Sequence, residues 1–319
     1  MIDRQKDEEY LRLKADFDVY YQEKLLPELK KSESSRYLYL LVFAALVAMG
    51  IIFYPTILHF ILVNGNENDH IIGFVLGGSC LIIMLLCGPL FKYRKKVKPQ
   101  IMPDFAEFFG SFSYFFGGKI DDNYLRQSDL FGKYNSNTGD DYFSGTYNDV
   151  RITVAEEKLE QKNQDFNGFE VNKKVFRGIC ILFEMNKNFK GRTVVLQDRG
   201  LLNILHKITG LQNVKLEDIR FEKYFEVYSD DQIEARYLLT AGFMERMMKL
   251  RELYEGESIQ FCFNRNTLLL AIPTKQDMFE AHSFFGSNIN KKRIDLVFEQ
   301  FYTIFSIVKL LKLNQKTGM

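Results

Sequence analysis

Two long apolar blocks lie near the start of the chain, and neither contains a charged residue. Tyr37 to Val63 covers 27 residues, and Ile71 to Phe91 covers 21. Because a helix rises about 1.5 Å per residue, either block can cross the roughly 30 Å hydrocarbon core of a bilayer. Only seven residues, Asn64 to His70, separate them. The pattern therefore predicts two transmembrane helices, residues 37–63 and 71–91, that form an antiparallel hairpin around a loop at 64–70.

Basic residues flank this hairpin at both outer ends. Lys30, Lys31 and Arg36 precede the first block, whereas the connecting loop has no Lys or Arg. The positive-inside rule then places both termini in the cytoplasm and the loop outside, as expected for a multi-pass membrane protein. A second basic flank follows the hairpin and is expected to anchor it at the lipid head groups; it consists of Lys92, Arg94, Lys95, Lys96 and Lys98.

Small residues recur at four-residue spacing in both blocks. Ala44 and Ala48 lie in the first, and Gly73 and Gly77 form a GxxxG pair in the second. Such faces let helices approach closely, because no large side chain separates the backbones. Packing within the hairpin and packing between protomers both remain open.

Helical periodicity flanks the hairpin and returns further along the chain. Residues 1–36 predict a cytoplasmic amphipathic helix, since Leu13, Phe17 and Leu25 recur at helical spacing between charged residues. Residues 92–103 are expected to form a basic juxtamembrane linker. Beyond them, the pattern predicts helices over the following ranges: Phe105 to Phe116, Leu238 to Tyr254, and a long C-terminal helix from Ile294 to Leu313.

Alternating and β-branched sequence predicts strands in the rest of residues 104–319. Two hairpins are expected: Tyr142 to Tyr147 with Val150 to Val154, and Ile259 to Phe263 with Thr267 to Ile272. Further strands are predicted at Phe176 to Glu184, Arg192 to Leu196 and Phe221 to Tyr228, and Asp231 with Glu234 has the spacing of a helix capping box. Antiparallel hairpins with flanking helices imply an α+β fold for this cytoplasmic domain.

Composition adds little to this interpretation. A formal net charge of +1 does not favour nucleic acid as a partner. The four cysteines form no CxxC pair, so buried, reduced thiols are expected at Cys80, Cys87, Cys180 and Cys262.

Motifs for catalysis, metal binding or cofactor binding are missing from the sequence. Gly118-Lys119 lacks the rest of a phosphate-binding loop, and Ser144-Gly145 lacks the first Gly of a nucleophile elbow. Adjacent Asp residues are typical of turns and caps, and a cation site would require folding to bring two such pairs together; the pairs are Asp121–Asp122, Asp140–Asp141 and Asp230–Asp231. We therefore expect no enzyme activity and no cofactor.

A basic loop follows the strand predicted at Phe176 to Glu184. It carries Lys187, Lys190 and Arg192. Near a membrane, such a loop contacts anionic head groups or a protein partner. An ordinary solvated turn explains the same residues.

Three stretches of the chain are similar to those of a known family. They are Asp141-Tyr-Phe-Ser-Gly145, Phe189-Lys-Gly-Arg-Thr193 and the long run Phe221-Glu-Lys-Tyr-Phe-Glu-Val-Tyr-Ser-Asp-Asp-Gln-Ile-Glu-Ala-Arg-Tyr-Leu-Leu-Thr240. The chain beyond about Pro103 resembles a bacterial family catalogued as a domain of unknown function, number 3137. The resemblance implies a membrane-tethered cytosolic domain and assigns no catalytic residues.

Three functions are consistent with these features. We expect a membrane-anchored interaction module, a scaffold, adaptor or sensor, that contacts the lipid bilayer and binds a protein or a second copy of itself. The first alternative is a lipid-binding or transport-accessory protein, suggested by 30 Phe residues and the apolar C-terminal helix. The second is an enzyme that acts on a membrane-proximal substrate.

Overall fold

The computed structural model describes residues 8–64, 88, 92–164, 170–185, 187–198, 210–254 and 258–313. These residues belong to two compact units. The sheet unit comprises residues up to 17, residues 105–279 and residues from 296 onward. The helical unit comprises residues 18–104 and 280–295.

The sheet unit is built on nine antiparallel strands. Their spatial order is β1-β2-β3-β4-β9-β8-β5-β7-β6, so β4 and β5 each pair with a strand that lies far along the chain. The strands are β1 Ser111–Phe116, β2 Ser136–Tyr147, β3 Val150–Gln164, β4 Glu170–Glu184, β5 Arg192–Gln197, β6 Gln212–Val214, β7 Phe225–Ser229, β8 Gln260–Asn264 and β9 Thr267–Pro273. This sheet, together with a long N-terminal helix and a C-terminal helix, confirms the α+β class.

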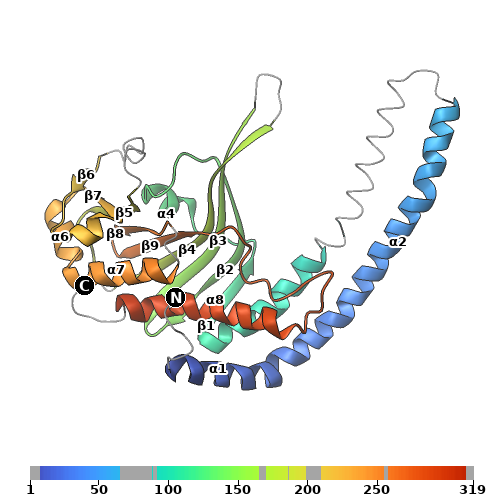
Figure 1. Cartoon of the computed structure of the whole chain (residues 1–319), viewed down its shortest axis with the longest axis horizontal. Coiled ribbons are helices and arrows are strands. Elements are labelled where there is room, and N and C mark those ends of the chain that lie inside the picture. The colour runs from blue at the N-terminus through green and yellow to red at the C-terminus, as the bar shows by residue number, and fades with distance from the viewer. Residues whose placement is uncertain are drawn as a thin grey trace. The chain divides into compact units, whose positions relative to one another are not determined.

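Helices cover both faces of the sheet (Figure 1). They are α4 Asp122–Gln127, α5 Ile219–Glu222, α6 Gln232–Leu238, α7 Ala241–Leu253 and α8 Lys291–Leu311. On one face, Leu125 of α4 packs into a core with Cys180 and Cys262. On the other face, Phe301 of α8 packs on Phe143, with ring centroids 5.0 Å apart. Burial of apolar surface on both faces is the main stabilising contribution to this unit.

Both predicted hairpins are confirmed. β2 and β3 are joined by a two-residue turn in which Asn148 and Asp149 have φ of 47° and 63°. Positive φ at both positions matches the twist of paired strands, and Asn and Asp tolerate it better than most residues do. β8 and β9 form the second hairpin. Asp231 also caps α6 as predicted, because its carboxylate accepts hydrogen bonds from Ile233 N and Glu234 N.

Two predicted elements are wrong in part. The helix predicted over Phe105 to Phe116 ends at Phe109, and Ser111–Phe116 is instead the edge strand β1. Gly110, at φ +154°, separates the two elements, and β1 alternates between more and less exposed positions, as a strand does. In the strand predicted over Phe221 to Tyr228, the first residues form α5 because Asp218 caps a helical turn there, so β7 begins only at Phe225.

From residue 18 on, the helical unit contains most of one long, nearly continuous helix, whose first residues belong to the sheet unit. α1 Glu8–Tyr20 leads through the π-helical turn η2 Tyr21–Leu25 into α2 Leu26–Asn64. Its apolar part is long enough to cross a membrane and is almost entirely exposed. Residues 92–109 are helical as well, so the segment predicted as a linker is part of a helix. The second predicted transmembrane block, 71–91, and the loop at 64–70 lie outside the described residues, apart from Asn64 and Gly88.

A buried polar cluster holds the helical unit together around Asn288, which is 0% exposed. Its side-chain amide donates to Ser32 Oγ at 2.9 Å and to the Tyr93 hydroxyl at 2.5 Å. Its backbone N–H donates to Glu33 Oε2 at 2.9 Å, and Arg36 pairs with the other oxygen of Glu33 at 2.6 Å. One loop residue thereby joins α2 to the helix at 92–109.

Candidate functional site

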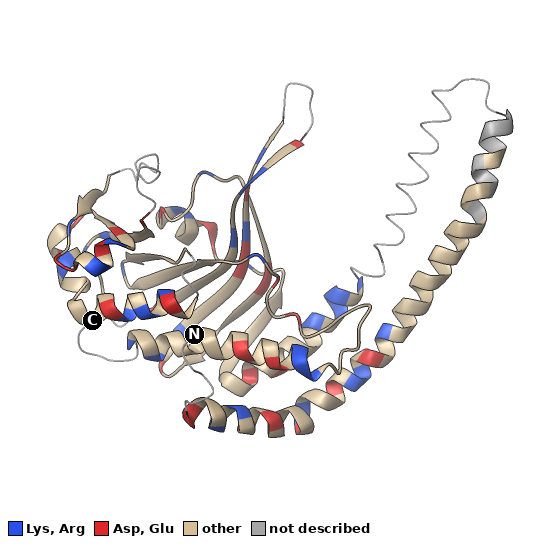
Figure 2. Ribbon diagram, viewed as in Figure 1, with Lys and Arg blue, Asp and Glu red and all other residues tan. Residues whose placement is uncertain are grey.

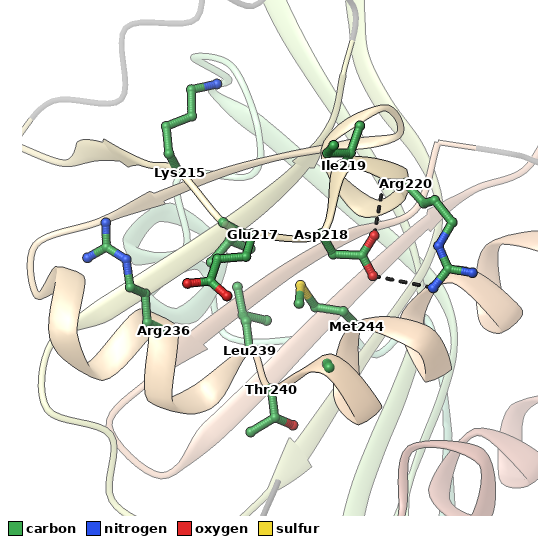
Figure 3. Close-up of a pocket in the computed structure, with 11 residues that line it drawn as sticks. Lys215, Glu217, Asp218, Ile219, Arg220, Arg236, Leu239, Thr240 and Met244 are labelled. Carbon is green, nitrogen blue, oxygen red and sulfur yellow. Dashed lines mark hydrogen bonds and ion pairs between the residues drawn. The ribbon is translucent and has the colours of Figure 1, made fainter.

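A cavity of about 710 Å³ opens at the end of the sheet unit near β6. Its walls come from two stretches of the chain: residues 215–220, which lead from β6 into α5, and the α6–α7 junction. Leu239 and Met244 project from that junction toward residues 215–220 (Figure 3). The cavity therefore has an apolar floor and a rim of charged side chains.

Helix caps fix the backbone of these walls. Asp218 accepts hydrogen bonds from Arg220 N at 2.9 Å and Phe221 N at 3.2 Å, and Thr240 accepts one from Phe243 N at 3.3 Å. Glu222 accepts one from Leu216 N at 2.8 Å. Each bond satisfies a backbone donor that a helix start or turn would otherwise leave unpaired. These caps thus fix the backbone of each wall segment.

Charge around the cavity is mixed. Three cations, Lys215, Arg220 and Arg236, line it together with the carboxylates of Glu217 and Asp218, and Asp218 lies beside Arg220 (Figure 3). Asp218 pairs with Arg220 at 3.5 Å. The backbone donors at Phe221 and Arg220, with the Arg220 side chain, lower the pKa of the Asp218 carboxyl. A preformed cavity with a few polar groups over an apolar floor is suited to binding a ligand or a side chain of a partner.

Exposed apolar side chains lie in the same stretch of sequence. Ile219 is 83% exposed, and Ile233 and Tyr237 of α6 are 82% and 69% exposed. Ile233 and Tyr237 are four residues apart and therefore share one face of α6. Large apolar residues that gather beside a cavity mark a binding surface more often than single scattered ones do.

Three carboxylates meet elsewhere, at a bulge in the β2–β3 pair. Ligand oxygens of Asp140, Asp141 and Glu156 lie within 4.8 Å of one another. The register shift between Gly139 and Tyr142 brings both Asp residues opposite Glu156. Burial, with the two Asp neighbours, raises the pKa of Glu156 to about 8 even though Met278 N donates to it at 3.1 Å. The Asp pair stands out in the sequence, but Glu156 does not, because no local pattern indicates the bulge that places it opposite the pair.

The other two Asp pairs serve the structural roles expected of adjacent Asp residues. Asp121 caps α4, and Asp231 caps α6. Asp230 accepts a hydrogen bond from Arg192 N at 2.7 Å. Asp122 accepts one from the Asn137 side chain at 2.9 Å. In the described residues, folding does not bring two of these pairs together.

A second buried carboxyl, Glu157, lies on the opposite face of β3 from Glu156. One of its oxygens accepts a hydrogen bond from Ile120 N at 2.6 Å. Its other oxygen and Asn137 Oδ1 both lack a hydrogen-bond donor, and burial raises the pKa of Glu157 to about 7. Burial disfavours the charged carboxylate, so the neutral acid is the form that suits this site.

The predicted basic loop does not present its three cations as one free patch. Lys187 pairs with Glu234 at 3.4 Å and lies over the Tyr237 ring at 4.7 Å. Arg192 pairs with Asp129 at 2.8 Å. Lys190 is exposed. Lys187 and Arg192 are thus engaged within the sheet unit by acidic residues that lie far from them in the sequence.

The predicted membrane flank divides in a similar way. Lys92, Lys95 and Lys96 are exposed. Lys98 is fully buried and pairs with Glu280 at 2.8 Å, and Arg94 pairs with the same carboxylate at 2.7 Å. Lys98 therefore serves as an internal ion-pair partner, which corrects its place among the exposed cations of this flank.

The remaining predicted residues fall on α2 or outside the described residues. Ala44 and Ala48 are exposed on α2. Gly73 and Gly77, the other small residues at which close helix packing was predicted, lie outside the described residues. Cys180 and Cys262 are buried free thiols, as expected, and burial raises the pKa of Cys262 to about 12. Cys80 and Cys87 are outside the described residues.

The cavity was not predicted from the sequence, although one conspicuous stretch of sequence contributes to it. The long run from Phe221 to Thr240 supplies α6 and part of the cavity wall. The sequence does not indicate that residues 215–220 fold over that run, because this arrangement depends on the pairing of β6 with β7.

Comparisons with known proteins give one family and one distant structural likeness. No curated protein matches the chain. The crystal structure of the mycobacterial trehalose monomycolate transport factor A, TtfA, aligns with a TM-score of 0.35 and 10% sequence identity, over 66% of this chain and 93% of that one. The family model described as "Protein of unknown function (DUF3137)" matches residues 174–313, which include β5 to β9, the cavity and α8. The match over residues 174–313 supports membership of this chain in the DUF3137 family.

Proposed function

We propose that this protein is a membrane-anchored interaction module, held in a bacterial inner membrane by two spans with both termini in the cytoplasm. The observation that carries this proposal is the surface of α2. From Tyr37 onward α2 has no charged residue, and large side chains such as Leu41 and Ile51 are 68% and 70% exposed. Figure 2 shows the charged residues of this helix confined to the part before that stretch. A bilayer is the solvent in which such a surface is stable.

A contact between two Tyr rings supports the position that we propose for the membrane interface along α2. Tyr39 of α2 and Tyr93 lie 5.7 Å apart, so the exposed Lys92, Lys95 and Lys96 flank the same level as the start of the apolar surface. Tyr residues and cations gather where hydrocarbon gives way to head groups. Each such cation contributes about 1 kcal/mol of attraction to an anionic leaflet.

The interaction surface in this proposal is the cavity with the exposed apolar face of α6. Its partner is a protein segment or a second copy of the chain, which would cover Ile233 and Tyr237 and insert a side chain over Leu239 and Met244. Aromatic and apolar anchors of this kind supply most of the binding free energy at protein interfaces.

The alternative of a lipid-binding domain has less support. Within the described residues, both faces of the sheet are filled by side chains, such as Phe143 and Phe301 on one face and Leu159 and Phe176 on the other. Charged side chains crowd the rim of the cavity near β6. An acyl chain offers no polar partner to these charged side chains.

Site-specific photocrosslinking in cells tests the proposal. A photoreactive amino acid at Tyr237 of the full-length protein is expected to give a discrete crosslinked species. A probe at Tyr124 of α4, which is 47% exposed, is the matched control and is expected to give none. Self-association would give a product of twice the 37.5 kDa mass of the chain.

A second variant tests whether the crosslink depends on the exposed apolar face of α6. Ile233→Asp places a charge in the apolar face of α6, and should abolish the Tyr237 crosslink without changing the amount of protein, because Ile233 is 82% exposed. Monomer alone with the Tyr237 probe, or a crosslink that survives Ile233→Asp unchanged, would contradict the proposed surface.

A further inference from the structure

A loop that is distant in sequence lies beside the start of the apolar surface of α2. Residues 280–290 precede α8 and belong to the helical unit. Arg36 donates to the carbonyl of Phe284 at 3.4 Å, and Ser283 N donates to Asn288 Oδ1 at 2.9 Å. With the buried cluster around Asn288, these bonds hold the loop against the last polar turns of α2 before Tyr37.

Two adjacent phenylalanines form the tip of this loop. Phe284 is 8% exposed and packs on Tyr93 and on Phe43 of α2, with ring centroids 5.6 Å away in both cases. Phe285 also contacts Phe43, at 5.7 Å, yet it is 69% exposed. Phe284 therefore anchors the tip, and Phe285 presents its ring outward next to α2.

The height of this tip along α2 follows from helix geometry. Phe43 lies six residues beyond Tyr37, which is about 9 Å along a helix. The head-group region on one side of a bilayer is roughly 5–7 Å thick, since the whole bilayer exceeds its hydrocarbon core by about 10–15 Å. If Tyr37 lies at the head groups, Phe43 and the ring of Phe285 reach the edge of the hydrocarbon.

We infer that Phe285 is a second membrane contact, which inserts beside α2 into the acyl chains of the cytoplasmic leaflet. This inference rests on the proposed membrane anchor and extends it to a loop some 240 residues further along the chain. The exposed part of Phe285 continues the exposed apolar surface of α2, where Leu38 and Leu41 are 63% and 68% exposed. The exposed Lys92, Lys95 and Lys96 at the same end of the unit are placed to meet lipid phosphates.

The rigidity of the loop strengthens this inference. Glu33, Arg36 and Asn288 are all at most 9% exposed and bonded to one another or to the loop backbone. Hydrogen bonding to Arg36 and Asn288 lowers the pKa of Glu33, so the cluster remains charged and paired at neutral pH. These bonds keep the loop, and with it the exposed ring of Phe285, beside the apolar surface of α2.

The protein contains no Trp, so single Trp substitutions report their own surroundings. We would compare Phe285→Trp, Met49→Trp and Val19→Trp in the full-length protein, reconstituted in vesicles of phosphatidylcholine and phosphatidylglycerol with or without bromine on the acyl chains. Met49, 52% exposed on α2, tests the anchor itself. Val19 is 57% exposed and lies 18 residues before Tyr37, about 27 Å along the helix, so it is the aqueous control.

We expect Met49→Trp to be quenched most by bromine deep in the acyl chains. Phe285→Trp should be quenched most by bromine near the carbonyl end, with a blue-shifted emission, and Val19→Trp should be unchanged by either lipid. Emission from Phe285→Trp that matches Val19→Trp, while Met49→Trp is quenched, would overturn the inference and leave the anchor standing. Loss of quenching at both Met49 and Phe285 would overturn the anchor as well.

Discussion

Replacing Asn288 with Ala is expected to destabilise the loop at residues 280–290 by about 3–5 kcal/mol, because it leaves buried partners without a hydrogen bond. The Tyr93 hydroxyl and Ser283 N–H lose the bonds that the Asn288 amide makes to them. Ser32 loses one as well but still donates to Leu29 O at 2.8 Å. Each 1.4 kcal/mol is a factor of ten, so amide hydrogen exchange in this loop should accelerate by about two orders of magnitude or more.

The matched control is Asn188→Ala, since Asn188 is an exposed loop residue of the sheet unit. Its exchange pattern should equal that of the unsubstituted protein in both units. Equal protection of residues 280–290 in Asn288→Ala would mean that the polar cluster is not what holds the loop. The same variant should also reduce lipid quenching of Phe285→Trp, because the tip would no longer be fixed against α2.

Glu157→Gln is expected to stabilise the protein at pH 8 and to change little at pH 4.5. The pKa of Glu157 is raised to about 7 from an ordinary value of 4.5, so the folded state holds the proton more tightly than the unfolded state does. The stability that this proton contributes is complete below pH 4.5 and is lost as the pH rises through 7. A shift of this size corresponds to roughly 3 kcal/mol at high pH.

Gln reproduces the neutral acid at this position. Its oxygen can accept from Ile120 N, and its amide carries no charge that burial would disfavour. The charged and titratable groups around it are Lys119, Asp122, Tyr134 and Cys180.

Chemical denaturation at pH 4.5 and pH 8 measures the difference between the variant and the unsubstituted protein. Glu156 titrates near pH 8 in both proteins, so only that difference isolates Glu157. Glu184→Gln is the control, because Glu184 is 47% exposed and pairs loosely with Arg151 at 3.7 Å. A Glu157→Gln protein that is less stable than the unsubstituted one at pH 8 would show that the carboxylate is accommodated.

The elements predicted correctly are those encoded in neighbouring residues. The Asn148–Asp149 turn and the Asp231 cap depend on side chains within a few positions, so local sequence specifies them. β1 was predicted as helix because its Phe-rich sequence follows a true helix, and its pairing with β2 residues 25 or more positions away decides its conformation. Tertiary contacts overrode the local pattern there.

The sites depended on contacts that no local pattern reveals. Lys98 was predicted at the membrane surface, yet Glu280, distant in sequence, buries it in an ion pair. The cavity near β6, the Glu156 cluster and the Phe285 tip all combine segments that meet only after folding. The long, exposed apolar helix could be predicted because a charge-free stretch of this length satisfies its own backbone as a helix, whatever the rest of the chain does.

The position of residue Asn66 tests the account most directly, since the proposed anchor places it across the membrane from both termini. A phosphatase reporter that is active only outside the cytoplasm, inserted at Asn66 of the full-length chain, is expected to be active, and the same reporter at the C-terminus is expected to be inactive. An inactive reporter at Asn66, with a cytoplasmic fluorescent reporter at the same position that folds and emits, would contradict the membrane anchor and the Phe285 contact that depends on it.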